Sequence, residues 1–418
     1  MNSTISIRMY NVGFGDCFLI RIPAKGGERR MLIDCGYHSQ GKGKFTDKTL
    51  VQQIEEDLDG QPLHVVVATH RHQDHISGFG ESQMWKKIDV HEVWLPFTAN
   101  PGAVRGDPSL RAWHALMDSA ASHLGADGRL TDEARNALGA RSSMEQAEVE
   151  FLLWNARANA PGIENLLTGM SRRDGGLTRR VFFPKDGSAF PSKYETSELP
   201  GVTVHILGPP RDPSLRKSKR VPASWGVRAL AGPAPAGDDL GAPFGRDWQI
   251  ASHRLPGRRP FQDRTLRSMM RFNDDLFRAA HAVEGFLNGE SLVLVLEFKT
   301  ARLLLPGDAE VGTWTAILET PEALAIAQSA TFLKVGHHGS HNASPLNFVN
   351  GLAARTPAVI STQKGPGNFR NNIPFQPLLK ALEARHLRHV RTDEGVKPVK
   401  GLFKQDPEKR WIDCTIPC

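Results

Sequence analysis

The chain has 418 residues, of which 40% are hydrophobic and 23% charged, a balance typical of folded globular proteins that excludes disorder along the whole chain. No apolar run approaches the roughly 18 residues needed to cross a bilayer. The first residues lack a basic segment followed by an apolar one, so no signal peptide is expected. Four cysteines are too few for a disulfide framework and favour a reducing, cytoplasmic setting.

The net charge of +7 is distributed unevenly along the chain. Residues 211–280 contain 14 Lys and Arg against 7 Asp and Glu, which leaves 38 basic and 38 acidic residues elsewhere. One stretch therefore carries the whole excess of positive charge. Such a stretch indicates either a solvated irregular loop or a contact surface for an anionic partner such as nucleic acid.

The first part of the chain is predicted to form strands separated by tight turns. Apolar, β-rich segments fall, in chain order, at residues 5–12, 17–22, 30–34, 63–69 and 90–96. The strand at 63–69 is apolar almost throughout, which is typical of a strand buried on both faces. Leu50, Ile54 and Leu58 lie four residues apart and predict a helix over 46–58.

The middle of the chain is predicted to hold two insertions. Residues 98–200 are rich in Ala, Leu, Arg and Glu and are expected to form a helical insertion, with helices such as 109–124 and 143–158. A strand over 202–207 follows. Residues 211–284 then form a basic insertion rich in Pro, Gly and Arg, with a helical pattern over 261–286.

The last part returns to alternating strands and helices. Expected strands are residues 291–298, 301–305, 331–335 and 358–361, and expected helices are 313–319, 321–327 and 377–386. Cys414 and Cys418 are expected to lie in a frayed tail. The order of elements predicts one α/β domain over residues 1–418, an αββα sandwich of two mixed sheets with helices outside and two insertions.

The segment at residues 69–75 carries the clearest chemical signal, because His70, His72, Asp74 and His75 follow a buried strand within six residues. Neutral imidazole and carboxylate are ligands that zinc, manganese and iron favour. A lone histidine is more often structural, but this density of donors predicts a metal site. His70 and His72 lie on one side of an extended segment and can chelate one ion, while Asp74 and His75 can face a second ion.

Later segments supply further candidate ligands at strand ends. Asp308 follows the strand at 301–305, and His337 and His338 follow the strand at 331–335. Strand ends along one edge of a sandwich converge, so these side chains are expected to meet the first group. Asp34 ends another strand, and it is either a turn residue or a carboxylate that orients a ligand histidine.

Together these segments resemble the metallo-β-lactamase superfamily. The HxHxDH motif is complete at residues 70–75, and Asp34-x-Gly36, Gly307-Asp308 and His-His-Gly-Ser appear in the family's order. A closer resemblance is to ComEC-type metallo-hydrolases, relatives of the cytosolic domain of DNA-uptake channels. MYNVGFGDCFLI, NGESLVLVLEFKTARLLLPGDAE and LKVGHHGSHNASP look like three of their segments. The resemblance covers residues 5–97, 201–210 and 285–395, without the membrane channel.

The resemblance implies an αββα sandwich with two divalent metal ions, zinc or manganese, and hydrolysis by a metal-bound hydroxide. By family role, His70 and His72 hold one ion, Asp74 and His75 hold the other, and Asp308 bridges them. One of His337 and His338 completes the second site. His337 is favoured as this ligand because it comes first after the strand. Asp74 and His338 are then the catalytic pair, with His338 donating a proton or binding a substrate oxygen.

The sequence departs from the family at two positions. Many members place a further metal histidine at the end of the strand over 202–207, where this chain has Gly208. His205, which lies early in that strand, is one candidate for the missing ligand, and His253 and His281 of the second insertion are others. Ile373 stands where relatives often place a histidine before proline.

Three hypotheses about function remain open. The first is a phosphodiesterase or nuclease whose second insertion stacks bases on Trp225 and Trp248 and binds phosphates through Arg216, Lys217, Lys219, Arg220, Arg254, Arg258 and Arg259. The second is a hydrolase of a small ester, lactone or cyclic nucleotide, with residues 98–200 as a lid. The third is an effector of a bacterial defence system, controlled by a protein partner that docks on the insertions. None of the three requires a membrane.

Overall fold

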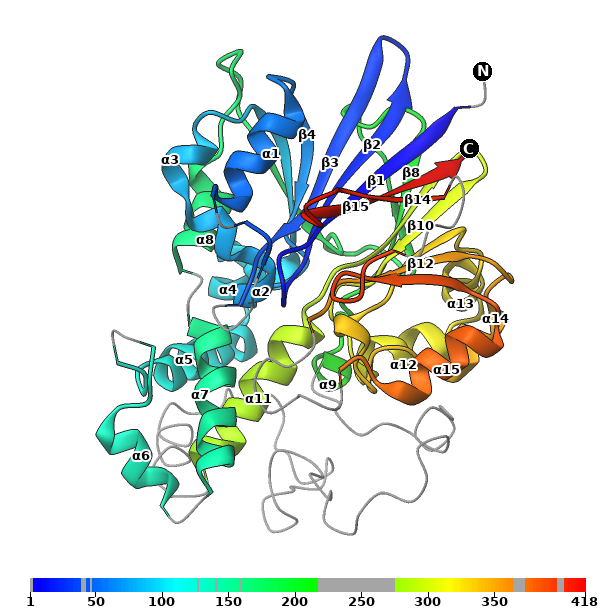
Figure 1. The fold of residues 1–418 in the computed structure, drawn as a ribbon. Helices are drawn as coiled ribbons and strands as arrows, with labels where there is room; N and C mark the ends of the chain where they lie inside the picture. The colour runs from blue at the N-terminus through cyan, green and yellow to red at the C-terminus, as the bar shows by residue number, and fades with distance from the viewer. Residues whose placement is uncertain are drawn as a thin grey trace.

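Two mixed sheets face each other in the computed structural model, and helices cover their outer faces (Figure 1). The expected αββα sandwich is therefore correct. The structure describes residues 3–38, 43–45, 47–125, 128–139, 142–157, 160–216, 275–363, 373–396 and 402–418. Within these residues, no helix is both long and apolar enough to span a membrane.

The first sheet has eight strands in the order β14-β15-β1-β2-β3-β4-β5-β6. Their bounds are β1 Thr4–Tyr10, β2 Cys17–Ala24, β3 Gly27–Cys35, β4 Leu63–Val67, β5 Val90–Pro96, β6 Arg179–Phe183, β14 Phe403–Gln405 and β15 Trp411–Pro417. Strands β3 to β6 are parallel, so their carboxyl ends open onto one edge. Asp34 near the end of β3 and the HxHxDH segment after β4 come together at this edge.

The second sheet has seven strands in the order β13-β12-β11-β10-β9-β8-β7. Their bounds are β7 Ser192–Tyr194, β8 Val202–Gly208, β9 Val293–Phe298, β10 Ala301–Leu305, β11 Phe332–Lys334, β12 Pro357–Ile360 and β13 Arg388–Arg391. Strands β10 to β13 are parallel. Asp308 follows β10 and His338 follows β11, so the second sheet presents its candidate ligands at its own carboxyl edge.

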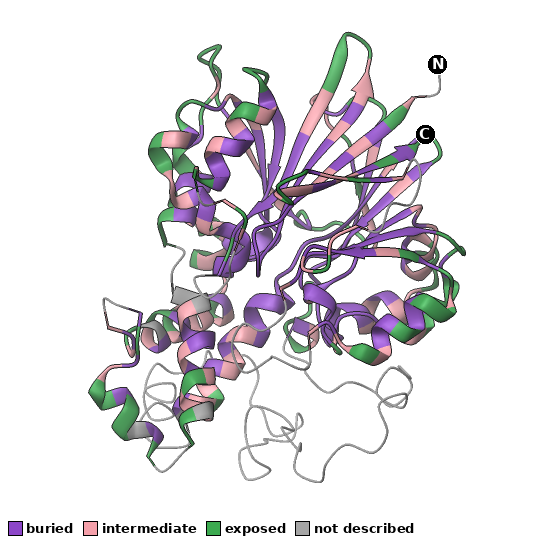
Figure 2. Cartoon of the chain, in the orientation of Figure 1, coloured by how far each residue is buried: buried purple, intermediate pink, exposed green. Residues whose placement is uncertain are grey.

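The main core lies between the sheets, where alternate residues of each strand point inward. Ile5, Ile7 and Met9 of β1 meet side chains of the second sheet such as Leu294 and Leu296, and all five are at most 1% exposed. This period of two is what a half-buried strand requires. Each fully buried aliphatic side chain contributes about 1.5–3 kcal/mol to folding. In Figure 2 the buried residues run through both sheets, and exposed residues lie on the outer helices.

Helices cover the outer face of each sheet and form two further cores. The first sheet carries α1 Leu50–Leu58, α2 Gln73–Ile76, α3 Ser82–Trp85, α8 Ala160–Glu164 and the one-turn helices η1 Ser77–Gly80 and η3 Asn165–Gly169. The second sheet carries α12 Val311–Glu319, α13 Pro321–Gln328, α14 Leu346–Gly351, α15 Gln376–Ala384 and the turn η8 His337–Gly339. Helix α1 begins at a capping box in which Thr49 and Gln52 bond reciprocally.

The remaining helices gather beyond the ligand-bearing edge, where they lie under both sheets in Figure 1. They are η2 Phe97–Ala99, α4 Pro101–Gly106, α5 Pro108–Ala121, α6 Asp132–Leu138, α7 Ser143–Arg157, α9 Pro213–Arg216 and α11 Asp275–Gly289. Trp113 of α5 stacks on Phe286 of α11 at 4.5 Å between ring centroids. Phe14 and Phe97 of the sandwich join the same apolar cluster. The two insertions therefore share one core next to the edge.

Residues 98–200 are not helical throughout, which corrects the prediction of a helical insertion. Helices α4 to α8 fill its first part, but β6 and β7 then add an edge strand to each sheet. Both strands are short; β6 pairs with β5, which lies far earlier in the chain, while β7 pairs with the following strand β8. The local pattern of residues does not show such pairing. In the second insertion, residues 217–274 lie outside the described residues.

The C-terminal segment is a strand inside the first sheet, which corrects the expectation of a frayed tail. Strand β15 pairs with β1 in antiparallel register from Thr4–Pro417 to Tyr10–Trp411. Cys414 is 1% exposed and belongs to the core between the sheets. All four cysteines are free thiols. The first strand of the chain, β1, and its last strand, β15, therefore lie side by side in the first sheet.

Candidate metal centre

The HxHxDH segment is held where β4 turns into α2. His72 is the residue before the first turn of α2, and the backbone N–H groups of His75 and Ile76 both donate to its carbonyl. Gly36 packs directly against this turn, because a Cβ at Gly36 would lie 2.4 Å from the His75 nitrogen. The backbone N–H of Asp16 donates to the Asp74 carbonyl at 2.8 Å. The loops after β1 and β3 thus fix the position of the segment.

Four side chains from the two sheets converge at this point: Asp74, His75, Asp308 and His338. Each offers one ligand atom, and the four atoms all lie within 4.8 Å of one another. His338 Nε2 is 2.9 Å from Asp74 Oδ2 and 3.3 Å from Asp308 Oδ2. His75 Nε2 is 3.1 Å from Asp308 Oδ2. All four residues are at most 2% exposed, so the cluster is sealed from bulk solvent.

His70 and His72 form a second pair beside this cluster. His70 Nε2 lies 3.0 Å from His72 Nδ1, and the His70 ring is 4.1 Å from the His75 ring between centroids. Burial lowers the pKa of His70, with the neighbouring His75 adding to the effect, and burial lowers the pKa of His72 to about 4. Both imidazoles are therefore neutral near pH 7, the state in which imidazole binds metal.

The chemistry of these donors fits divalent cations. Buried carboxylates and neutral imidazoles are the ligand set that zinc and manganese accept. Although His75 Nε2 points at Asp308, it makes no hydrogen bond to any described residue. Burial alone would lower the pKa of His338, but Asp308 and Asp74 outweigh it and raise that pKa to about 10. The carboxylates thus attract positive charge strongly, and a divalent metal ion would supply it.

Asp34 holds His75 in place from the side opposite the cluster. Its Oδ2 is 2.7 Å from His75 Nδ1 and accepts a hydrogen bond from the Thr69 hydroxyl at 2.7 Å. Its Oδ1 accepts from the Thr69 backbone N–H at 2.7 Å. A carboxylate on one ring nitrogen fixes the tautomer and turns the other nitrogen toward the metal position. Asp34 therefore occupies the place of an orienting carboxylate.

Lys334 and Asp16 belong to the site, although the sequence did not single them out. The Lys334 ammonium, at the end of β11, pairs with Asp16 and lies 3.2 Å from Asp308 Oδ1. Burial would lower the pKa of Lys334, but Asp16 and Asp308 raise it, so the ammonium stays charged. Two features of the sequence could have indicated them: Lys334 is a charged residue within an apolar strand, and Asp16 ends the segment Gly-Phe-Gly-Asp. Lys334 neutralises part of the negative charge of the cluster.

The structure brings His338, not His337, to the carboxylates. The two residues occupy adjacent positions in the turn η8, both with positive φ, and their rings diverge. His338 Nδ1 is 2.9 Å from the Ser361 carbonyl, which directs Nε2 to Asp74. His337 instead lies 3.5 Å from Glu310 Oε1 through its Nδ1. His338, and not the favoured His337, is thus the histidine that meets Asp74 and Asp308, while its predicted role as a proton donor stays a prediction.

None of the proposed substitutes for the missing histidine reaches the cluster in the part of the chain that is described. His205 on β8 pairs through Nε2 with Glu297 at 2.7 Å, which corrects its assignment as a candidate ligand. His281 lies 3.4 Å from Glu148. His253 lies outside the described residues. A Cβ at Gly208 would lie 2.7 Å from Thr313 Cγ2, so packing leaves no room for a histidine there.

Most of the basic residues expected to contact substrate lie outside the described residues: Lys217, Lys219, Arg220, Arg254, Arg258 and Arg259, together with Trp225 and Trp248. Arg216, the last residue of α9, is described and is only 3% exposed. Its guanidinium carbon lies 5.1 Å from the centre of the Phe97 ring. Burial lowers the pKa of Arg216, while Glu290 opposes that effect. Arg216 is thus packed beneath the edge rather than presented on the surface.

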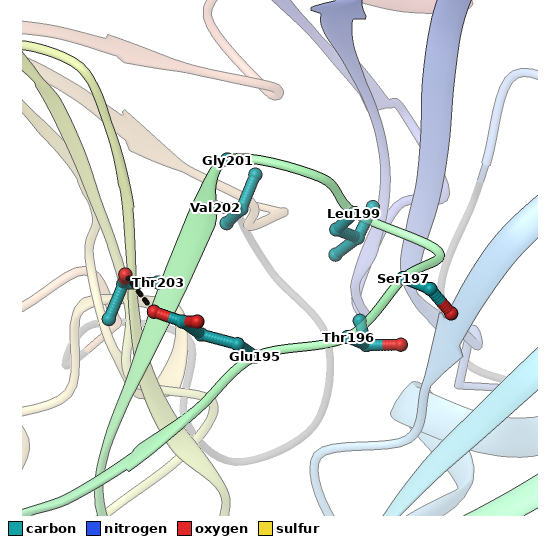
Figure 3. A pocket seen from close by; sticks show the side chains of 7 residues that line it. All are labelled: Glu195, Thr196, Ser197, Leu199, Gly201, Val202 and Thr203. Atoms are coloured by element: carbon teal, nitrogen blue, oxygen red, sulfur yellow. Dashed lines mark hydrogen bonds between the residues drawn. The ribbon is translucent and has the colours of Figure 1, made fainter.

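A separate hollow lies at the connection between β7 and β8. Figure 3 shows its lining, in which Thr203 donates a hydrogen bond to Glu195 at 2.9 Å. The residues that line it are Glu195, Thr196, Ser197, Leu199, Gly201, Val202 and Thr203. None of them belongs to the His/Asp cluster. This hollow is therefore not the site of the chemistry that the cluster indicates.

Comparison with known proteins agrees with the fold and the site. Residues 10–108, which include β2 to β5 and the HxHxDH segment, match the sequence model of the Metallo-beta-lactamase superfamily. A stretch of 108 residues is 34% identical to ComE operon protein 3 of Bacillus subtilis (strain 168). That stretch makes up 26% of this chain and 13% of the Bacillus protein. Residues 10–108 of the chain are therefore similar to the metallo-beta-lactamase superfamily, and the same part of the fold contributes to a His/Asp cluster suited to binding metal.

Proposed function

We propose that this protein is a metal-dependent phosphodiesterase that acts on nucleic acid through a centre for two divalent ions. The observation that carries the proposal is the convergence of Asp74, His75, Asp308 and His338 within 4.8 Å, next to the paired nitrogens of His70 and His72. Zinc or manganese bound there supplies Lewis acidity that lowers the pKa of water and stabilises charge on a phosphoryl oxygen.

The protein's own contribution is to fix the donors before substrate arrives. Asp34 holds the ring of His75, and the Ser361 carbonyl holds the ring of His338. Lys334 keeps Asp308 ionised, because its ammonium lies 3.2 Å from Oδ1. The cluster is buried, so each of these interactions acts in a low dielectric, where electrostatic effects are stronger than in water. Such preorganisation is the main way in which enzymes stabilise developing charge.

The attachment points of the basic stretch support an anionic substrate. The basic stretch at residues 211–280 begins at α9 and returns through α11. A Cβ at Gly289 would lie 2.2 Å from the Arg216 carbonyl, so these two helices touch backbone to backbone. Both ends of the stretch are thus tied to the helices beyond the ligand-bearing edge. A basic stretch attached at these two ends supports a phosphate-bearing substrate.

A small phosphodiester or ester, such as a cyclic nucleotide, is the second candidate substrate. The observation that favours it is the aromatic cover over the centre. Phe151 of α7 stacks on His38 at 4.1 Å between centroids, and Phe14 lies 4.4 Å from the ring of His338. A centre covered by helices of the first insertion suits a small substrate better than a long polymer.

The direct test is hydrolysis by the purified chain supplied with Mn²⁺ or Zn²⁺. Single- and double-stranded DNA, RNA, cyclic nucleotides and bis(p-nitrophenyl) phosphate are compared as substrates. The proposal expects cleavage of nucleic acid that is lost in an Asp74→Ala/His75→Ala variant. The matched control is Glu297→Gln, because Glu297 lies at the far end of the second sheet with His205. Hydrolysis of small esters alone supports the second candidate. Equal activity in the double variant and the parent contradicts both.

A further inference from the structure

A second group of metal-type donors lies next to the buried centre. Glu284 of α11, Glu310 before α12 and His337 after β11 each offer one ligand atom, and the three atoms lie within 4.8 Å of one another. Glu310 follows Asp308 by two residues, and His337 directly precedes His338. The group is therefore built from the same two loops as the buried centre, with one added residue from the second insertion.

A fully buried amide holds the two carboxylates of this group together. Asn288 Nδ2 donates to Glu284 Oε1 at 3.1 Å and to Glu310 Oε1 at 2.8 Å. The ligand atoms of these two carboxylates lie within 4.8 Å of each other, so the two ionised groups repel each other unless positive charge lies between them. His337 Nδ1 lies 3.5 Å from Glu310 Oε1, but it makes no hydrogen bond within the described part of the chain. The imidazole nitrogen thus points at the carboxylates without being bonded to them.

The His70–His72 pair also carries a ring nitrogen without a partner. His72 is 2% exposed, and its Nε2 has no hydrogen-bond partner among the described residues.

The end of β8 leaves no room for a donor side chain. At Gly208, Thr313 Cγ2 and Val293 Cγ2 would lie 2.7 and 2.9 Å from any Cβ. Thr313 belongs to α12, which begins immediately after Glu310. The first turn of α12 therefore fills the space beside Gly208, and the residue just before this helix is the acidic donor Glu310.

We propose that Glu284, Glu310 and His337 bind a divalent cation beside the buried centre. Two carboxylates and one imidazole suit Mn²⁺ or Zn²⁺. The second insertion then contributes directly to metal binding through α11. Binding of this cation does not depend on which ester the protein hydrolyses, so the proposal stands apart from the proposed substrate.

The test is Mn²⁺ binding to the full-length protein after removal of metal by a chelator, followed by electron paramagnetic resonance and by metal analysis of gel-filtered protein. Glu284→Gln and His337→Asn are each expected to remove one class of Mn²⁺ sites, or to weaken it by about tenfold or more. His75→Ala is expected to impair the buried centre and leave this class in place. Activity plays no part in the readout.

Glu148→Gln is the matched control, because Glu148 on α7 acts electrostatically on Glu284 but contacts His281 instead of the group. It should bind Mn²⁺ like the parent. Equal weakening by Glu148→Gln and Glu284→Gln would overturn the proposal, since general loss of negative charge would then explain both. Parental binding by Glu284→Gln would overturn it as well. Anomalous diffraction from crystals of the parent soaked in Mn²⁺ should show a peak between Glu284, Glu310 and His337, and absence of that peak contradicts the site.

Discussion

Asp34 lies behind His75, and its carboxylate determines how that ring faces the cluster. In an Asp34→Asn variant the amide oxygen still accepts from Thr69, so the fold is expected to persist. The charge that holds His75 Nδ1 is lost. We expect affinity for Mn²⁺ or Zn²⁺ to fall by about 10- to 100-fold, the usual effect of losing such a partner. Titration calorimetry measures this change.

Asp413→Asn serves as the comparison for that prediction. Asp413 pairs with Arg8 at 2.8 Å on β15, in the first sheet and away from the cluster. Its variant should bind metal as the parent does. Unchanged affinity in Asp34→Asn would mean that His75 is held by packing alone.

The Lys334 ammonium lies against Asp16 and Asp308 together. Replacing it by Met leaves two buried carboxylates without their ammonium, which we expect to lower the free energy of unfolding by about 3–5 kcal/mol. Added Mn²⁺ should restore part of this loss, because a bound cation neutralises Asp308. Urea unfolding with and without Mn²⁺ tests this, and an equal loss in both conditions would contradict the metal assignment of Asp308.

The sequence could predict the ligands that lie within one short motif. His70, His72, Asp74 and His75 are visible because they crowd one strand end. His337 and His338 could not be told apart, since a turn with positive φ at both residues decides which ring faces inward. Lys334 could not be assigned to the site either, because its role depends on an ion pair with Asp16, which lies in the loop before β2 of the other sheet. Pairings between distant segments carry this information, and residue spacing does not.

Helix α9 ties the start of the second insertion to α12 of the second sheet. Its backbone lies so close to α12 that a Cβ at Gly312 would be 1.3 Å from the Leu215 carbonyl oxygen. Gly312→Ala should therefore displace α9 and lower the free energy of unfolding by about 1–3 kcal/mol, as overpacking does. Chemical denaturation measures the change.

Gly106→Ala is the matched substitution for that prediction. Gly106 ends α4, and a Cβ there would meet nothing within 4 Å. Because alanine loses less chain entropy than glycine in a helix, this variant should match the parent or gain up to about 0.5–1 kcal/mol. If Gly312→Ala were equally harmless, α9 would not be seated as the structure shows.

Strands could be predicted from sequence where they are apolar and long, and less well where a partner defines them. β1 to β5 and β8 to β12 were expected within a few residues of their bounds. β6, β7 and β13 to β15 were not, because each is short or alternates charged and apolar residues, as in RRVFF of β6. The strand form of β6 and β15 depends on hydrogen bonds to neighbours far along the chain, which are β5 and β1.

The whole sandwich depends on its last strand. Ile412, Ile416 and Phe403 are buried in the core between the sheets, and each contributes about 1.5–3 kcal/mol. A domain's total stability is only about 5–15 kcal/mol, so deleting residues 402–418 should leave the chain unfolded or insoluble. Circular dichroism and the soluble fraction report this. Deletion of Cys418 alone should be tolerated, and a folded 402–418 deletion would contradict the pairing of β15 with β1.

At the level of the whole molecule, two sheets bring one edge each to a common point, and both insertions gather beyond it. The His/Asp cluster is shared between the sheets, with Asp74 and His75 from the first and Asp308 and His338 from the second. Metal binding should therefore join the two halves of the sandwich. Phe14 of the sandwich and Phe151 of α7 pack at 6.2 Å between ring centroids, so the first insertion also meets the centre.

The most direct test of the account is anomalous diffraction from crystals of the protein soaked in Mn²⁺. We expect an anomalous peak for metal between Asp74, His75, Asp308 and His338, with a neighbouring ion at His70 and His72. An Asp74→Ala/His75→Ala crystal treated in the same way should lose this density and keep the sandwich. Metal elsewhere with none at the four residues, or the same peak in the variant, would contradict the central claim that this cluster is the metal centre.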